Sequence, residues 1–119
     1  MPMTPVQEAL AQWWIDTTKA ELEMLLPKVE EYSAYDLELI GTAMADTIGW
    51  EGELTPGEAT EIGIAFYVMG KVGRVLGAVR EGRLPSEDTW VDLAVYSRMA
   101  LRAKQAGAWP GNPEQEDKN

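Results

Sequence analysis

The amino-acid sequence predicts an all-α fold, a single bundle of four main helices. Three observations lead to this prediction. Apolar residues recur at spacings of three and four along most of the chain, which is the period of one helix face. No segment shows the alternation of apolar and polar residues that marks a half-buried strand. Residues of high helix propensity are abundant, and start and stop signals separate the periodic segments.

The first helix is expected over about residues 5–26. Thr4 and Pro5 resemble a helix cap followed by proline at the first helical position. The residues that recur on one face are Val6, Leu10, Trp13, Thr17, Ala20 and Met24. Pro27 interrupts this pattern, so the helix ends or kinks near Leu26.

A second helix is expected over about residues 34–48, with Gly49 as its stop signal. Its apolar face carries Leu37, Ile40, Met44 and Ile48. The segment from Lys28 to Tyr35 fits either a helix that resumes after a kink or a connecting turn.

The third helix has the clearest start in the chain and is expected to run to about Glu81. Thr55 caps it, Pro56 takes the first helical position, and Glu58 completes a capping box. Its interior contains glycines at seven-residue intervals, namely Gly63, Gly70 and Gly77. Because glycine destabilises a helix, this row predicts that another backbone approaches closely.

The fourth helix is expected over about residues 86–105, with Ser86 as its cap. Asp88 and Asp92 lie one turn apart, on a face that continues with Val95 and Met99. An acid on such a face needs a partner, and a divalent cation is one candidate. The expected domain is 1–106, followed by a tail at 107–119 that is rich in proline, glycine and charge.

Composition excludes several classes of chemistry. The chain of 119 residues has neither cysteine nor histidine, so disulfides, thiolate zinc sites and histidine-based catalysis are excluded. Any metal must be held by oxygen ligands, which favours Mg²⁺, Mn²⁺ or Ca²⁺. The net charge of −10 argues against duplex nucleic acid and anionic membranes as partners. We see neither a transmembrane segment nor a signal peptide, and expect a cytoplasmic protein.

Acidic side chains form the candidate metal site. Glu58 and Glu61 are spaced three apart, and Asp88 and Asp92 four apart, so two helices could each bring a carboxylate pair to one cation. Glu61 and Asp92 lie on apolar faces and are the stronger candidates. Glu58 and Asp88 are also explained by capping and by the helix dipole. A third group contains Glu30, Glu31 and Asp36, which is more typical of a solvated face than of a metal site.

Basic and aromatic side chains form the candidate substrate site. Lys71 and Arg74 lie one turn apart and could hold a triphosphate, although salt bridges to nearby acids explain them equally well. Tyr96 lies one turn beyond Asp92 and could stack on a base, or could be a half-buried core residue.

Two stretches of the sequence resemble a bacteriophage family of MazG-like proteins. The more specific stretch runs from Gly70-Lys71-Val72-Gly73-Arg74 through Gly82-Arg83-Leu84-Pro85 to Ser86-Glu87-Asp88-Thr89, Asp92 and Tyr96. The weaker stretch comprises Lys28, Glu31-Tyr32-Ser33 and Asp36-Leu37. Together the likeness spans about residues 28–110.

The resemblance implies an all-α bundle that hydrolyses nucleoside triphosphates to the monophosphate and pyrophosphate with Mg²⁺ or Mn²⁺. It implies a homodimer or tetramer, in the host cytoplasm for a phage-encoded protein. The metal ligands carried over are Glu58, Glu61, Asp88 and Asp92, with Glu31 as a further contributor, and Glu61 and Asp92 as the catalytic pair. The sequence departs from the family pattern at Gly57 and in the four-residue spacing of the second pair. Two alternatives are therefore a nucleotide-binding module with a degenerate site and a non-catalytic interaction protein.

Overall fold

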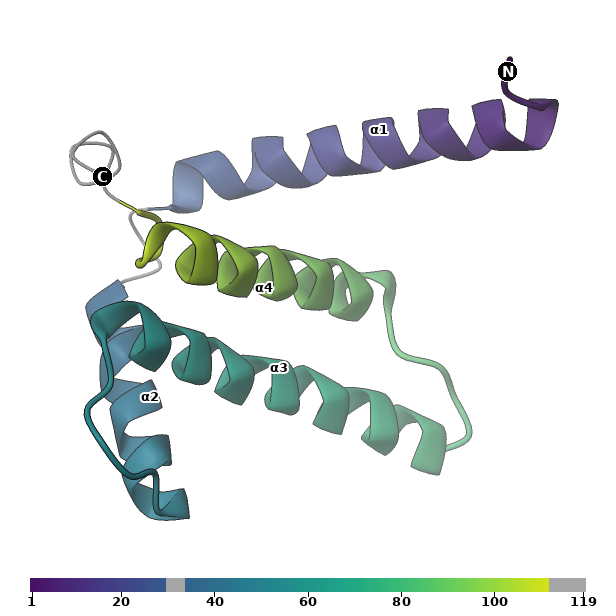
Figure 1. Cartoon of the computed structure of the whole chain (residues 1–119). Coiled ribbons are helices and arrows are strands. Elements are labelled where there is room, and N and C mark those ends of the chain that lie inside the picture. The colour runs from purple at the N-terminus through teal and green to yellow at the C-terminus, as the bar shows by residue number, and fades with distance from the viewer. Residues whose placement is uncertain (30–33, 112–119) are drawn as a thin grey trace. The chain divides into compact units, whose positions relative to one another are not determined.

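The computed structural model describes residues 1–29 and 34–111, and within these ranges its regular structure is helical, without strands. The predicted all-α fold class is confirmed. The helices are α1 (Pro5–Leu25), α2 (Ala34–Ile48), α3 (Pro56–Arg80) and α4 (Glu87–Ala106), and a short 3-10 helix, η1 (Leu26–Lys28), follows α1 (Figure 1). Each expected helix is present, with bounds that differ by one residue at most from those expected.

Local signals set most of the helix ends. At the start of α3, the Thr55 hydroxyl accepts the Glu58 N–H at 3.1 Å, and the Glu58 carboxylate accepts the Thr55 N–H at 2.9 Å. This is the predicted capping box. Gly49 and Gly107 follow α2 and α4 with φ of 83° and 77°, a region that favours glycine.

Ser86 corrects one prediction about capping. It occupies the N-cap position of α4, but its side chain makes no capping hydrogen bond. Its hydroxyl lies 3.4 Å from the Thr89 hydroxyl instead. The Thr89 N–H donates to the Ser86 carbonyl at 3.1 Å, so the first turn is closed through the backbone.

The chain divides into two compact units, residues 1–31 and 32–119. The single domain expected over 1–106 stays a prediction. The first unit contains α1 and η1, and α1 ends at Leu25, just before Pro27, as the sequence indicated. The second unit consists of α2, α3 and α4, and α3 packs against both of the others.

The core of the second unit lies between α3 and its two neighbours. Ile64 of α3 and Met99 of α4 are fully buried. On the other side, α2 and α3 approach so closely that a Cβ at Gly63 would collide with the Leu37 carbonyl, and one at Gly41 with the Ala59 carbonyl. Glycine is therefore required where these two backbones meet.

The remaining glycines of α3 do not follow the same rule. The close approach predicted for the row is confirmed at Gly63. It is wrong at Gly70 and Gly77, where an added Cβ would meet no described atom of this chain. The reason is that α2 reaches only the first turns of α3 (Figure 1).

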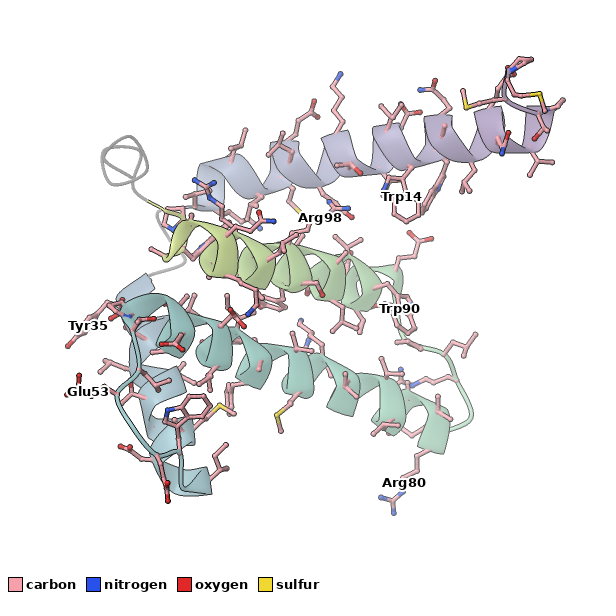
Figure 2. All side chains as sticks on the ribbon, in the orientation of Figure 1. Trp14, Tyr35, Glu53, Arg80, Trp90 and Arg98 are labelled. Carbon is pink, nitrogen blue, oxygen red and sulfur yellow. The ribbon has the colours of Figure 1, made fainter. Side chains whose placement is uncertain are left out.

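Large apolar side chains stay exposed on the second unit. Tyr35 at the start of α2 and Trp90 at the start of α4 are more than half exposed (Figure 2). Leu101 of α4 is also exposed, so this unit leaves apolar side chains uncovered at both ends of α4.

Helix α3 is, in the described part of the chain, the one helix that is long and apolar enough to span a membrane by length and composition alone. The sequence had suggested no such segment, because Lys71 and Arg74 interrupt its longest apolar run. The other residues of α3 are apolar enough that its mean hydropathy still reaches that of a membrane-spanning helix despite these two charges. The helix packs against α2 and α4.

The start of the predicted tail is packed, as far as the structure describes it. Trp109 is buried, and the Arg102 Nε donates to the Pro110 carbonyl at 2.8 Å. Residues 112–119 lie outside the described residues.

Candidate functional site

Helices α3 and α4 are antiparallel and lie side by side, and the candidate residues are distributed along their line of contact (Figure 1). Three pairs of side chains join the helices. Because the helices are antiparallel, residue numbers rise along α3 as those of their partners on α4 fall. The pairs, in the order of α3, are Glu61 with Lys104, Tyr67 with Tyr96, and Lys71 with Asp92. We call this series the α3–α4 row.

Asp92 is paired with a lysine. The Lys71 Nζ lies 2.7 Å from the Asp92 Oδ2. The Lys71 side chain is 16% exposed and the Asp92 side chain 37%, so the pair is partly shielded from water. The sequence indicated that Asp92 needs a cationic partner, and the structure supplies one from within the chain. Both carboxylate and ammonium are thereby neutralised without a metal.

Glu61 is paired in the same way at the other end of the row. The Lys104 Nζ lies 3.3 Å from the Glu61 Oε1. Both residues line a shallow pocket of about 170 Å³, together with the capping residues Thr55 and Glu58. The Thr55 N–H and hydroxyl hold the pKa of Glu58 below its ordinary value of 4.5, and the Lys104 charge lowers it further.

The two acid pairs are separated along the helices. Glu61 and Lys71 are ten residues apart on α3, which places Glu61 about 15 Å from the Lys71–Asp92 pair at 1.5 Å per residue. One cation cannot contact both Glu61 and Asp92 in a single copy of this conformation, because carboxylate ligands of Mg²⁺ lie about 2 Å from the ion.

No group of three acids able to hold a metal ion is present in residues 1–29 and 34–111. Asp88 is exposed and makes no ion pair with a described residue. Glu31 lies outside the described residues. The metal-binding and catalytic roles suggested for these acids stay predictions.

Tyr96 lies in the row, between the two ion pairs. Its ring stacks on Tyr67, with centroids 5.7 Å apart and an angle of 23° between the planes. Tyr67 is 38% exposed, and Tyr96 is half-buried. The Tyr67 ring also contacts Phe66 edge-on, with centroids 5.7 Å apart, and its exposed part lies on α3, one turn before Lys71.

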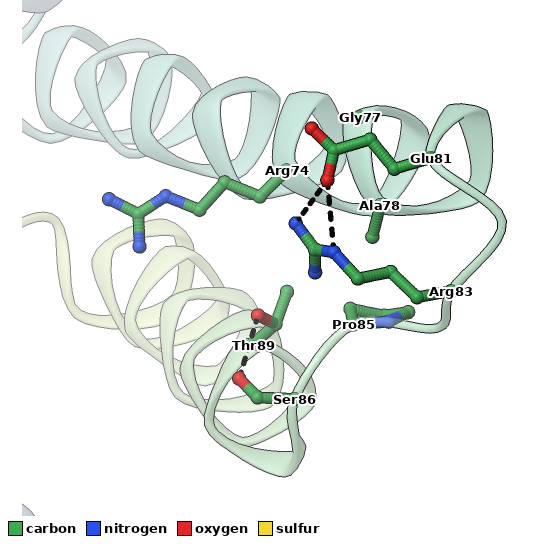
Figure 3. Close-up of a pocket in the computed structure, with 8 residues that line it drawn as sticks. All are labelled: Arg74, Gly77, Ala78, Glu81, Arg83, Pro85, Ser86 and Thr89. Atoms are coloured by element: carbon green, nitrogen blue, oxygen red, sulfur yellow. Dashed lines mark hydrogen bonds and ion pairs between the residues drawn. The ribbon is translucent and has the colours of Figure 1, made fainter.

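Beyond the Lys71–Asp92 pair, the row leads to a pocket of about 340 Å³ at the end of α3 and the start of α4 (Figure 3). Its lining residues are Arg74, Gly77, Ala78, Glu81, Arg83, Pro85, Ser86 and Thr89. The turn between the helices brings Arg83 back over the pocket, where its guanidinium pairs with Glu81 at 2.9 Å. The lining carries two arginines and one glutamate, a formal charge of +1.

Arg74 is the cationic group of this pocket that is available to a ligand. It makes no ion pair or hydrogen bond with any described residue, and Figure 3 shows it without a contact to the other lining residues. The first turn of α4 adds Ser86 and Thr89 hydroxyls and the positive end of the helix dipole. Together these groups are suited to a phosphate or another oxyanion.

Sequence analysis selected part of this site. The structure brings together Lys71, Arg74 and Tyr96, the three substrate-binding candidates, along one pair of helices. Sequence reasoning missed Ser86 and Thr89 as lining residues, because Ser86 was explained as a helix cap and Thr89 was noted only as part of the family motif. The signal that could have found them is the short Gly82–Pro85 turn, which forces the start of α4 against the end of α3.

Comparison with family models, with curated proteins and with solved structures finds no match for this chain.

Proposed function

We propose that this chain is a MazG-like protein that binds a nucleoside phosphate along the α3–α4 row without hydrolysing it through a metal ion. The observation that carries the proposal is the row itself. In this row Lys71 is the counter-ion of Asp92, whereas Arg74 has no ion-pair partner among the described residues and lines a pocket of about 340 Å³.

The phosphate end of the site is the pocket. A polyphosphate has several anionic oxygens, and Arg74 offers a planar guanidinium that can bind two of them at once. Arg83 lies opposite and can exchange Glu81 for a phosphate, since an exposed ion pair of this kind contributes little to stability. The start of α4 contributes its dipole to the same anion.

The base end of the site is the tyrosine pair. Tyr67 and Arg74 are seven residues apart on α3, or about 10 Å along the helix axis. This is close to the span from the base to the terminal phosphate of an extended nucleoside triphosphate. A base can stack on the exposed part of Tyr67, with the phosphates directed toward Arg74.

The proposal departs from the hydrolysis that the resemblance implies. Hydrolysis with Mg²⁺ requires carboxylates that hold the ion and activate a water molecule. Here the two acids expected to do so are about 15 Å apart and are each paired with lysine. The separation of these acids therefore supports a nucleotide-binding module with a degenerate site over an Mg²⁺-dependent hydrolase.

The test is calorimetric titration of the chain with a nucleoside triphosphate. Arg74→Ala removes the available guanidinium and should weaken binding at least about tenfold, the loss expected for one charge-assisted hydrogen bond. Arg80→Ala is the matched control, because Arg80 is an exposed arginine of the same helix that does not line the pocket. Equal affinities for both variants, or no binding by the wild type, would refute the proposal.

A further inference from the structure

The backbone of the turn that follows α3 holds Glu81 and Arg83 in place at the pocket. The Gly82 N–H donates to the Val79 carbonyl and the Arg83 N–H to the Ala78 carbonyl, both at 3.0 Å. Gly82 has a φ of 79°, in the left-handed region. Together these features make a Schellman motif, which ends a helix by folding the chain back over its last turn. Glu81 and Arg83 therefore flank a tightly folded glycine, and both line the pocket.

The Glu81 carboxylate occupies the part of Arg83 that is best suited to a phosphate. Its Oε2 atom accepts a hydrogen bond from the Arg83 Nε at 3.0 Å and lies 2.9 Å from the Arg83 Nη2 (Figure 3). Two such neighbouring N–H groups are what a guanidinium offers to the oxygens of a phosphate. In the free protein, a carboxylate of the chain itself therefore holds the place that a phosphate would take.

The position of this ion pair decides which ligands reach it. With the base on Tyr67, the phosphates extend along α3 toward Arg74, about 10 Å away along the helix axis. Arg83 lies farther on, because its N–H is bonded to Ala78, one turn beyond Arg74. A nucleoside triphosphate is long enough to bring its terminal phosphate to the pair. A monophosphate lacks the two outer phosphates and ends short of it.

We propose that Glu81 is a built-in competitor for the terminal phosphate of a nucleoside triphosphate, an inference that rests on the proposed function. On binding, the terminal phosphate takes the Arg83 guanidinium and the Glu81 carboxylate turns to solvent. Arg74 has no ion-pair partner among the described residues, so its contact with a phosphate requires no such exchange. Arg83 thus strengthens and Glu81 weakens the binding of triphosphates, while monophosphates are affected by neither.

The charges and the exposure of the pair favour this exchange. The Arg83 and Glu81 side chains are 62% and 66% exposed, and an ion pair this open to water contributes little to stability. A terminal phosphate carries close to two negative charges at pH 8, since its second pKa is about 6, whereas the carboxylate carries one. The phosphate therefore attracts the guanidinium more strongly than Glu81 does.

The first test is calorimetric titration of the full chain with ATP and with AMP, at pH 8 in EDTA. Glu81→Gln keeps the shape of the side chain but removes the competing charge. It should raise the affinity for ATP about fivefold or more and leave that for AMP within about twofold. Glu87→Gln is the matched control, because Glu87 is also exposed and lies outside the pocket lining. It removes the same charge from the chain and should leave both affinities within about twofold, since salt screens charges outside the pocket.

The second test removes the group for which the two anions compete. Arg83→Ala should weaken ATP binding about fivefold and leave AMP binding within about twofold. In the Arg83→Ala chain, adding Glu81→Gln should change the affinity for ATP by less than about twofold, because no guanidinium is left to release. Circular dichroism should show unchanged helix content in all variants, since both side chains are exposed.

An affinity for ATP that Glu81→Gln leaves unchanged, or an equal gain for AMP, would overturn the proposal. An equal gain in Glu87→Gln, or a gain that persists in the Arg83→Ala chain, would mean simple charge repulsion and would overturn it too. Each of these results can occur while Arg74→Ala still weakens ATP binding, so the nucleotide site would stand without the competitor. Absence of ATP binding by both the wild type and Glu81→Gln would instead overturn the nucleotide site and this inference with it.

Discussion

Gly63 and Gly70 occupy equivalent positions one heptad apart on α3, yet their surroundings are opposite. A Cβ at Gly63 would meet the backbone of Leu37, whereas a Cβ at Gly70 would meet no described atom. The same residue type therefore serves close packing at one position and only weakens the helix at the other. A sequence pattern of spaced glycines cannot separate these two cases.

Matched alanine substitutions should reveal this difference. Gly63→Ala should lower the free energy of unfolding by about 1–3 kcal/mol, because the α2 and α3 backbones must separate. Gly70→Ala should raise it by about 0.8–1 kcal/mol through helix propensity. Urea denaturation of both variants measures the two values. A change of the same sign in both would show that the environments are alike.

Glu58 makes the start of α3 sensitive to acid. Its pKa is held low by the Thr55 N–H, so its carboxylate stabilises the folded state above its ordinary pKa of 4.5. This contribution is lost as the pH falls below 4.5 and through the lowered value. Glu58→Gln keeps an acceptor for Thr55 but has no charge to lose.

The stability difference between wild type and Glu58→Gln should therefore be constant at neutral pH and shrink as the pH falls below 4.5. Denaturation midpoints measured across this range give the difference directly. A difference that is independent of pH would mean that the carboxylate charge has no role in the cap.

At the scale of the elements, local sequence signals predict where the helices begin and end. They do not predict which side chains pair between helices. The sequence alone predicts the helix ends marked by the Thr4 and Thr55 caps, by Pro27 and by Gly49. The pairing of Lys71 with Asp92 depends on the register of α3 against α4. That register is set by the short turn and by the packing of Ile64 and Met99, which no single-helix pattern contains.

The candidate site shows the same limit. Asp92 was recognised as an acid in need of a cation, because it heads an apolar face. Whether that cation is a metal or a lysine is decided across two helices, where the Lys71 Nζ lies 2.7 Å from its carboxylate. Arg74 and Tyr96 were recognised by chemistry, but the pocket itself arises only where α3 ends against α4.

The Lys71–Asp92 pair should couple α3 to α4 measurably. Asp92→Asn should lower stability, in contrast to the gain expected if Asp92 were an unpaired metal ligand. In a double-mutant cycle with Lys71→Met, the coupling energy should be about 0.5–1 kcal/mol, as for a partly exposed ion pair. Thermal or urea unfolding gives the four values. Zero coupling, or a more stable Asp92→Asn variant, would argue against this pairing in solution.

For the whole molecule, the acidic balance and the helical architecture set the kind of ligand that the site can take. With a net charge of −10, the surface disfavours polyanions in general, so an anion must bind where positive groups converge. In the described residues, the end of the α3–α4 row is such a place, with Arg74, Arg83 and the start of α4. A small phosphorylated ligand fits it, whereas a duplex nucleic acid would meet the acidic surface around it.

The most direct test of the account is the dependence of nucleotide binding on Mg²⁺. Wild-type chain is titrated with a nucleoside triphosphate in excess EDTA and again in millimolar Mg²⁺, and the nucleotide is recovered afterward and separated by chromatography. We predict binding in EDTA, of an affinity within about tenfold of that in Mg²⁺, and recovery of intact triphosphate in both cases, because the groups that hold the phosphates are arginines. Binding that requires Mg²⁺, together with release of monophosphate and pyrophosphate, would contradict the account and restore the acids as metal ligands.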